Sequence, residues 1–510
     1  MRNSFIQFKE KKITLNFCDA LTVFRNDHVT VMLKGKAYLK NKGLTVEGIA
    51  REVVSRGVYN VINELTGIFC AFIFHENYIY MGRSMHSGPQ LFYHINGDAL
   101  YIADKISELI KLPSFTGSLN LRVAQKYLNG CRNNDNNSFI TGVHKINNGE
   151  FVKFDYQLSS TSVIDEFCIK KKNDSVIDNV ISNIEMTHEN RDITLLFSGG
   201  FDSSLVFHAL KELGFMFRAC YYVSEYSDDS EMEFARRYCL KYDVEFAAIN
   251  KKIDFNEEHY YELNPDVPDE IPLAPELSCE SEESYGLKSE NGFLICGHGG
   301  DHIFGQNPSV LFGLDALRKH GIKTMHKKMV EYSCLKGLKY KDIFIKNMAA
   351  LRQKPAMYTL AKDEHISTMR LASAQFFSVD IRNKVNIFTP FLFKNIVQHH
   401  VSLPVYELFN QQYDRYPMRF EAFSRYGSDI FWKKSKRSSS QLIFRILSEK
   451  CENIANAIEQ SGLADAMNIN HSELSKDLYE NTRVLLTDRL PYLISLYRLA
   501  KYMQIHRINI

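Results

Sequence analysis

Two glycine-rich segments carry the residue types that phosphate chemistry requires. The first, residues 198–204, reads SGGFDSS and follows the apolar run 195–197. Adjacent glycines allow backbone N–H groups to approach an anion closely, and a helix that starts near residue 202 would point its positive end at the same place. Three serine hydroxyls add further donors. The segment therefore predicts a binding loop for a pyrophosphate group.

An acidic residue stands in each glycine-rich segment. Asp202 would repel a phosphate, but its carboxylate suits a magnesium ion that bridges two phosphates. A second carboxylate, Asp301, lies in the stretch 297–305, directly after the apolar run 293–296. We predict that Asp202 and Asp301 hold Mg²⁺ together. The alternative is a pair of tight strand-to-helix turns without any chemistry.

The elements around these segments alternate between strand and helix. Apolar runs at 193–197, 219–223 and 245–249 are separated by helical patterns up to 213 and over 231–242, and this alternation predicts a parallel doubly wound sheet. A further helix is expected over 176–186, and the chain beyond 305 has the pattern of a mainly helical lobe.

The first part of the chain has a different pattern. Short β-rich runs with turn signals between residues 13 and 155 predict an antiparallel sheet domain with a few helices. A polar stretch at 170–175 then separates two expected domains, 1–165 and 176–510.

Charge and composition exclude several classes of protein. The 62 basic and 60 acidic side chains give a net charge of +2, so we expect neither a nucleic-acid partner nor a global attraction to membranes. No apolar run is long enough to span a bilayer, and we expect a cytoplasmic protein. Ten cysteines are scattered singly, which indicates neither a zinc site nor a disulfide framework.

Both glycine-rich segments resemble those of a known enzyme superfamily. Residues 198–204 are similar to the PP-loop of asparagine synthetases and β-lactam synthetases, and 296–305 are similar to their SGEGADELFGG segment. The resemblance implies an α/β PP-loop ATP-pyrophosphatase domain with a mainly helical C-terminal lobe, ATP as substrate, and Mg²⁺ at the two aspartates. It implies adenine and ribose contacts at Leu195, Phe197, Ser198, Val223 and Gly297, and pyrophosphate contacts at Gly199, Gly200, Asp202, Ser203 and Ser204.

The N-terminal region resembles the glutaminase half of asparagine synthetase at residues 82–93 and 101–106. The implied fold is an α+β, Ntn-type sandwich. A working glutaminase of this type uses a cysteine at position 2 whose own α-amine acts as the base. Position 2 is Arg2, and Cys18 is internal. We therefore expect a degenerate domain, which makes asparagine synthetase, or another amidotransferase-like ligase, the second choice of function.

A glutaminase remnant beside an intact PP-loop is similar to β-lactam synthetases and lasso-peptide cyclases. Residues 296–308, 414–417 and 433–441 resemble the microcin-type lasso cyclases, and this likeness extends over nearly the whole chain. It implies an ATP-dependent macrolactam synthetase. Such an enzyme adenylates an Asp or Glu side chain of a ribosomal precursor peptide and joins it to the peptide's N-terminal amine. The implied partners are a leader-peptide protease and a leader-recognition element.

Three residues are candidates for catalysis. Lys436, or Lys434 if the register differs, would stabilise the tetrahedral oxyanion, unless the basic segment is a solvated turn. His298 stands where relatives place Glu or Tyr, and its neutral imidazole could accept a proton from the attacking ammonium. The alternative for His298 is a hydrogen-bonded structural histidine.

Two rival functions remain open. The chain could be an inactive relative that only binds a peptide or partner protein, although the intact loop and acidic pair argue against this. A tRNA-modifying PP-loop enzyme would be expected to show a basic, aromatic-rich face or zinc cysteines, and neither is evident in the sequence.

Overall fold

The structure is a computed structural model of the chain. It describes residues 5–9, 12–16, 21–39, 42–86, 90–97, 99–112, 115, 117–129, 136–155, 160–164, 175–188, 192–223, 229–250, 265–271, 292–353, 359–383, 387–434, 451–470, 474 and 490–509.

The N-terminal part contains two antiparallel sheets. One has the strand order β10-β8-β9-β1-β2, and the other has the order β12-β11-β7-β6-β4-β3 with β5 paired to β4. The first sheet consists of β1 (Phe5–Lys9), β2 (Lys12–Asn16), β8 (Phe92–Asn96), β9 (Ala99–Ala103) and β10 (His144–Lys145). The second consists of β3 (Thr22–Arg25), β4 (Val29–Leu39), β5 (Lys42–Leu44), β6 (Leu65–His75), β7 (Tyr78–Arg83), β11 (Phe151–Asp155) and β12 (Ser160–Ile164).

The two sheets pack face to face. Phe72 and Met81 of the larger sheet share one apolar core with Leu100 and Ile102 of the smaller sheet. Successive side chains of a strand point to opposite faces, so Ile73 instead packs in the core formed with α1 (Val46–Arg56) and α2 (Val58–Glu64). This arrangement confirms the expected antiparallel β domain and shows it as a sandwich covered by helices.

The second sheet-bearing part is built on parallel strands. Its order is β15-β14-β13-β16-β17, and every neighbouring pair is parallel. Ile193, Thr194 and Leu195 are buried in succession, as expected for a strand covered on both faces. The predicted doubly wound sheet is confirmed. Its elements are α5 (Val176–His188), β13 (Asp192–Leu196), α6 (Phe201–Glu212), β14 (Phe217–Val223), α7 (Asp229–Lys241), β15 (Glu245–Asn250), β16 (Gly292–Ile295) and β17 (Ile387–Phe388).

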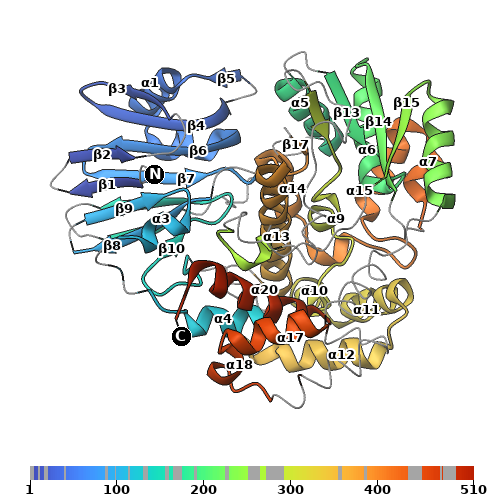
Figure 1. The fold of residues 1–510 in the computed structure, drawn as a ribbon. Coiled ribbons are helices and arrows are strands. Elements are labelled where there is room, and N and C mark those ends of the chain that lie inside the picture. Colours follow the sequence, from blue (N-terminus) through green and yellow to red (C-terminus); the bar gives the residue numbers. More distant parts are fainter. Residues whose placement is uncertain are drawn as a thin grey trace.

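A mainly helical lobe follows β16, as predicted. Figure 1 shows the long helix α13 in the middle of the molecule, between the N-terminal sheets and the parallel sheet. Pro417 occupies the first turn of α15, where its missing N–H costs no helical hydrogen bond. The helices are α9 (Gly300–Ile303), α10 (Phe312–His320), α11 (Ile322–Lys336), α12 (Tyr340–Ala349), α13 (Leu360–Asn383), α14 (Lys394–Ser402) and α15 (Tyr416–Tyr426).

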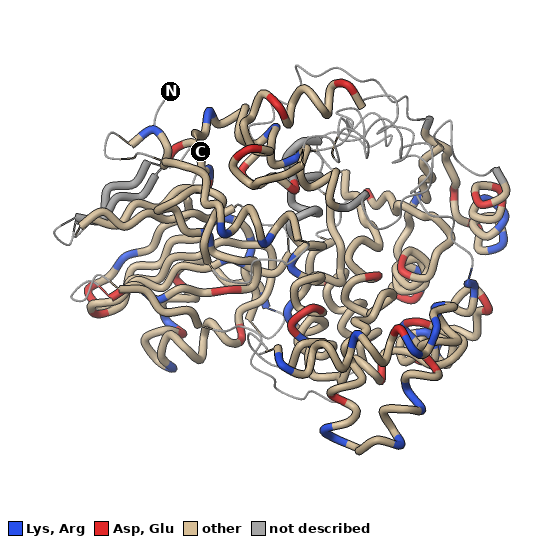
Figure 2. The backbone as a smooth tube through the Cα atoms, turned by 90° about the horizontal axis from the view of Figure 1, so that it is seen from below, with Lys and Arg blue, Asp and Glu red and all other residues tan. Residues whose placement is uncertain are grey.

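The last helices return to the N-terminal part of the molecule (Figure 1), and Figure 2 shows basic and acidic residues interspersed along the described chain. These are α17 (Cys451–Gln460), α18 (Leu463–Ala466) and α20 (Leu490–His506). Ile458 and Leu496 share a core with Leu109 of α3 (Ile106–Ile110) and Val123 of α4 (Leu121–Leu128). No sequence pattern predicts this contact. The division of the chain into residues 1–165 and 176–510 remains a prediction. Within the described ranges, no helix is both long and apolar enough to cross a bilayer.

Candidate active site

The first glycine-rich segment joins β13 to α6. Gly199 has φ +66°, and a Cβ there would lie 2.9 Å from the ring of Phe234, so both the backbone and the packing require glycine. Gly200 is the N-cap of α6, which places the helix N-terminus at the carboxyl end of the sheet. The hydroxyls of Ser198 and Ser203 approach to 3.3 Å across this turn.

The second glycine-rich segment packs directly on the first. A Cβ at Gly297 would lie 2.7 Å from the backbone nitrogen of Ser203, and a Cβ at Gly300 would lie 2.5 Å from Oδ1 of Asp202. Because both positions lack a side chain, the turn after β16 can touch the start of α6. The neighbouring strands β13 and β16 bring these turns together at one edge of the sheet.

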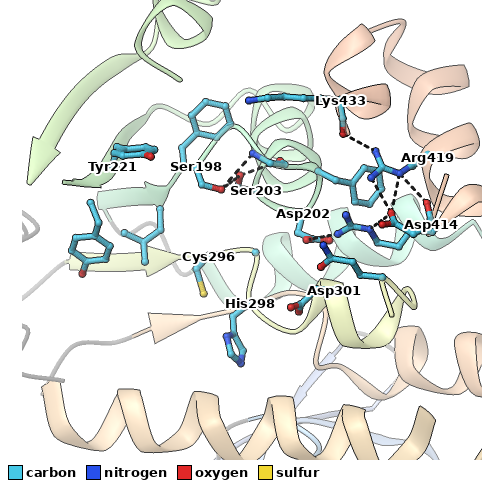
Figure 3. A pocket seen from close by; sticks show the side chains of 18 of the residues that line it. Ser198, Asp202, Ser203, Tyr221, Cys296, His298, Asp301, Asp414, Arg419 and Lys433 are labelled. Atoms are coloured by element: carbon cyan, nitrogen blue, oxygen red, sulfur yellow. Dashed lines mark hydrogen bonds and ion pairs between the residues drawn. The ribbon is translucent and has the colours of Figure 1, made fainter. Parts of the chain in front are cut away.

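The two turns open into a cavity of about 610 Å³. Figure 3 shows Asp202 and Asp301 close to one another on one side of it, with Tyr221 and Cys296 on the other. The predicted site residues that line the cavity are Phe197, Ser198, Gly200, Asp202, Ser203, Gly297, His298, Asp301 and Lys434.

Four other predicted contacts do not line this cavity. Leu195 is fully buried in the apolar core, and Ser204 is fully buried with its hydroxyl donating to the carbonyl of Gly200 at 2.7 Å. Gly199 faces Phe234, and Val223 ends β14. Lys436 lies outside the described residues.

An arginine lies between the carboxylates of two segments. Arg415 donates from Nη1 to Oδ2 of Asp202 at 2.8 Å and from Nε to Oδ1 of Asp414 at 3.0 Å. Arg419 binds the same Asp414 oxygen from Nη2 at 3.0 Å. Arg415 adopts φ +51°, a left-handed conformation that is uncommon for a side chain of this size. Such strain is typical of functional sites.

Asp301 is held as an anion. Burial opposes its ionisation, but the hydrogen bond and charge of His302 lower the pKa of Asp301 to about 2. Oδ1 of Asp301 accepts from Nδ1 of His302 at 2.8 Å. The described residues contain no cluster of three His, Cys, Asp or Glu side chains suited to a metal. Mg²⁺ bound to a nucleotide needs only one or two carboxylates, because phosphates and waters supply the rest, so this pair fits that ion.

His298 is anchored at two points. Its Nε2 donates to the carbonyl of Ala372 at 2.8 Å, and its own carbonyl accepts from the hydroxyl of Thr389 at 2.8 Å. Burial lowers the pKa of His298, against smaller raising effects from Ala372 and Asp301. In the neutral ring the proton on Nε2 is committed to Ala372, which leaves Nδ1 as the basic nitrogen.

Several residues of the cavity wall had no role predicted from the sequence. Lys433 places its ammonium 3.7 Å from the ring centre of Phe234, and Lys434 places its own 4.7 Å from that of Tyr413. The stretches 296–308, 414–417 and 433–441 carried the family resemblance, and this was the only signal for five of the missed residues: Cys296, Gln306, Asp414, Arg415 and Lys433. The lining residues without a predicted role are Leu196, Phe201, Cys220, Tyr221, Tyr222, Cys296, Gln306, Asp414, Arg415, Arg419 and Lys433.

More than half of the chain matches a known protein family. The profile of the Asparagine synthase family matches residues 184–484, and the chain belongs to that family. It is 52% identical over 505 residues to the Microcin J25-processing protein McjC of Escherichia coli, a match that covers 99% of this chain and 98% of that protein.

Similarity to solved structures is much weaker. The allosteric regulatory enzyme of purine biosynthesis matches 47% of this chain and 58% of its own, with 11% identity and a TM-score of 0.18. A glutamine phosphoribosylpyrophosphate amidotransferase from B. subtilis matches 56% of this chain and 60% of its own, with 10% identity and a TM-score of 0.18. At these TM-scores neither match bears on the fold.

Proposed function

We propose that the chain is an ATP-dependent macrolactam synthetase that closes an isopeptide ring in a ribosomal precursor peptide, the ring of a lasso peptide. The full-length identity of 52% to a microcin-processing protein supports this function. The observation that carries it is the cavity in which Asp202 and Asp301 lie beside the N-terminus of α6. That combination suits a magnesium–nucleotide complex.

The first step activates a carboxylate. An Asp or Glu side-chain oxygen of the peptide attacks the α-phosphorus of ATP, the bond to the β-phosphate oxygen breaks, and pyrophosphate leaves with the electron pair. Arg415, Lys433 and Lys434 give the cavity wall positive charge against the leaving pyrophosphate. Asp202 and Asp301 would hold Mg²⁺, which supplies Lewis-acid charge neutralisation when bound.

The second step forms the amide. The N-terminal amine of the peptide attacks the acyl carbon, its proton passes to Nδ1 of His298, and AMP leaves with the electrons of the broken C–O bond. The lowered pKa of His298 keeps its ring neutral, as a proton acceptor must be. Lys434 lines the cavity and can face the oxyanion, and Lys436 remains the second candidate for that role.

The remaining proposals concern the N-terminal domain and the partners. We assign residues 1–165 to a degenerate glutaminase-like domain, on the resemblance of residues 82–93 and 101–106 to the glutaminase half of asparagine synthetase. The amine then comes from the peptide rather than from glutamine. A protease that frees the peptide N-terminus, an element that recognises the leader, and a cytoplasmic location complete the proposal.

A reconstitution tests the proposed function. The full chain is incubated with ATP, Mg²⁺, the precursor peptide encoded beside it and the accompanying protease, and the peptide is weighed by mass spectrometry. We expect a product lighter by one water, with AMP and pyrophosphate formed in equal amounts. If the peptide stays linear while AMP accumulates, the acyl-AMP is formed but is hydrolysed by water, and this result would contradict ring closure. Absence of AMP would contradict the ligase assignment altogether.

A further inference from the structure

The N-terminal domain contacts the synthetase core next to His298. Met85, which follows β7, is part of the core cluster of the parallel-sheet domain. His86, the next residue, is fully buried and stacks on Phe388 of β17 with ring centres 5.5 Å apart. The N-terminal domain therefore packs against the strand that borders the proposed site.

One set of contacts reaches the imidazole of His298 through α13. Ser373 accepts a hydrogen bond from the amide of Asn148 and donates one to the carbonyl of Met85, so both of its partners belong to the N-terminal domain. Ala372, the preceding residue, supplies the carbonyl that binds Nε2 of His298. The N-terminal domain thus holds the turn of α13 that orients the ring.

A buried ion pair fixes the same turn of α13. Nη2 of Arg370 donates to Oε1 of Glu150 at 2.9 Å, and their side chains are only 8% and 3% exposed. Oε2 of Glu150 accepts from the side-chain amides of Asn136 and Asn147 at 3.1 and 3.0 Å. Contacts within its own domain therefore hold the carboxylate of Glu150 in place, so that this carboxylate is a rigid partner for Arg370 of α13.

A second set of contacts reaches the backbone of His298. Nε2 of His86 accepts from the backbone N–H of Thr389 at 3.2 Å. The hydroxyl of Thr389 donates to the carbonyl of His298 at 2.8 Å. The N-terminal domain therefore reaches His298 in two ways. The contacts through α13 hold its imidazole, and the contacts through Thr389 hold its backbone carbonyl.

We infer that the N-terminal domain serves the ligase reaction as the scaffold that positions His298, with Thr389, Ser373 and the Glu150–Arg370 pair as positioning residues. This inference rests on the proposed role of His298 as acceptor of the amine proton. A domain that has lost glutaminase chemistry would thereby retain a function in ring closure.

The test separates the two half-reactions. Acyl-AMP formation is measured by trapping with hydroxylamine, and ring closure is measured by mass in the same samples. In Thr389→Val, Ser373→Ala, His86→Phe and the double variant Glu150→Gln/Arg370→Gln, we expect near-normal hydroxamate but ring closure slowed roughly tenfold to a hundredfold, as when a general base is misplaced. Thr389→Ser keeps the hydroxyl and should restore ring closure.

High pH supplies a readout that loss of structure would not move. The peptide α-amine has a pKa of about 8, so above that pH it attacks without help from a base. The deficit in ring closure should therefore shrink as the pH rises to about 9. Thr187→Val is the matched control, because Thr187 is also buried and its hydroxyl also donates to a backbone carbonyl, that of Asn183 at 2.7 Å, in α5.

The outcomes distinguish this inference from the proposed function. Wild-type protein that forms no hydroxamate would overturn the proposed function. If the wild-type protein carries out both reactions, three results would overturn the scaffold inference alone. The variants could lose both half-reactions equally, they could show no rescue at high pH, or they could behave like Thr187→Val. Thermal unfolding of each variant identifies any that fail to fold. The comparison of Thr389→Val, which replaces the hydroxyl by a methyl group, with Thr389→Ser, which keeps the hydroxyl, then decides.

Discussion

Nη1 of Arg415 lies 2.8 Å from Oδ2 of Asp202, so the carboxylate that the sequence assigns to magnesium is paired with a guanidinium. The same guanidinium binds Asp414 through Nε. Its side chain is only 7% exposed. A bidentate donor with a fixed planar shape between two acids is well suited to exchange one acid for a phosphate oxygen when the nucleotide enters.

Removing this arginine should impair adenylation. In Arg415→Ala, Asp202 and Asp414 lose a shared cation at the cavity wall, and we expect pyrophosphate release to fall at least roughly a hundredfold. The matched control is Arg425→Ala. Arg425 also bridges two carboxylates, Glu212 and Asp178, but on the exposed surface, where such pairs contribute little. Equal rates in the two variants would contradict a role for Arg415 in the site.

The acidic pair should be indispensable. Asp202→Ala and Asp301→Ala are each expected to abolish conversion of ATP to pyrophosphate, since both carboxylates are assigned to the metal. Circular dichroism and thermal unfolding should remain close to wild type. Asp178→Ala, which removes an exposed carboxylate of α5, serves as control. Normal turnover in either cavity variant would remove the metal assignment.

Gly300 gives a test of the contact between the two turns. Glycine to alanine in a helix interior ordinarily adds about 1 kcal/mol of stability, and at the first residue of α9 a smaller gain would be expected. At Gly300, however, the new Cβ would lie 2.5 Å from Oδ1 of Asp202. We expect Gly300→Ala to lower the melting temperature and raise the KM for ATP. Gly43→Ala is the control, because a Cβ there meets nothing closer than 3.8 Å. A stabilised, fully active Gly300→Ala would show that the turns are not in contact.

His298 should act only in the second half-reaction. His298→Ala is expected to form hydroxamate from the trapped acyl-AMP but to close few rings. Because burial lowers the pKa of His298 below 6.5, its ring stays neutral through physiological pH and becomes protonated only in acid. Wild-type ring closure should therefore decline at some pH below 6.5, and hydroxamate formation should not decline with it. Loss of hydroxamate in the variant would count against this role.

The sequence predicted the parallel sheet well, because local signals agree there. The strand at 193–197 and the helix after it are encoded by a continuous apolar run followed by glycines, and β13 and α6 lie where those signals place them. Asp202 and Asp301 both line the cavity, because the turns after the neighbouring strands β13 and β16 meet at one edge of the sheet.

The rest of the site depends on contacts distant in the sequence. Asp202 and Arg415 are 213 residues apart, and no local pattern pairs them. Ala372 contributes only a backbone carbonyl to His298, a role that any residue type could fill. The return of α20 to α4 likewise requires a complementary apolar surface rather than a motif. The hydroxyl of Ser204 was expected at the pyrophosphate, yet a serine one turn into a helix can instead donate back to a carbonyl, as it does to Gly200.

Oxygen isotope transfer tests most directly whether this cavity turns a peptide carboxylate into its AMP ester. The precursor peptide is prepared with ¹⁸O in its acceptor Asp or Glu side chain and incubated with the full chain, the protease, ATP and Mg²⁺. The account predicts one ¹⁸O atom in the phosphate of each AMP formed, none in pyrophosphate, and a ring that retains the other. Label in inorganic phosphate with release of ADP, or AMP free of label beside a closed ring, would contradict it.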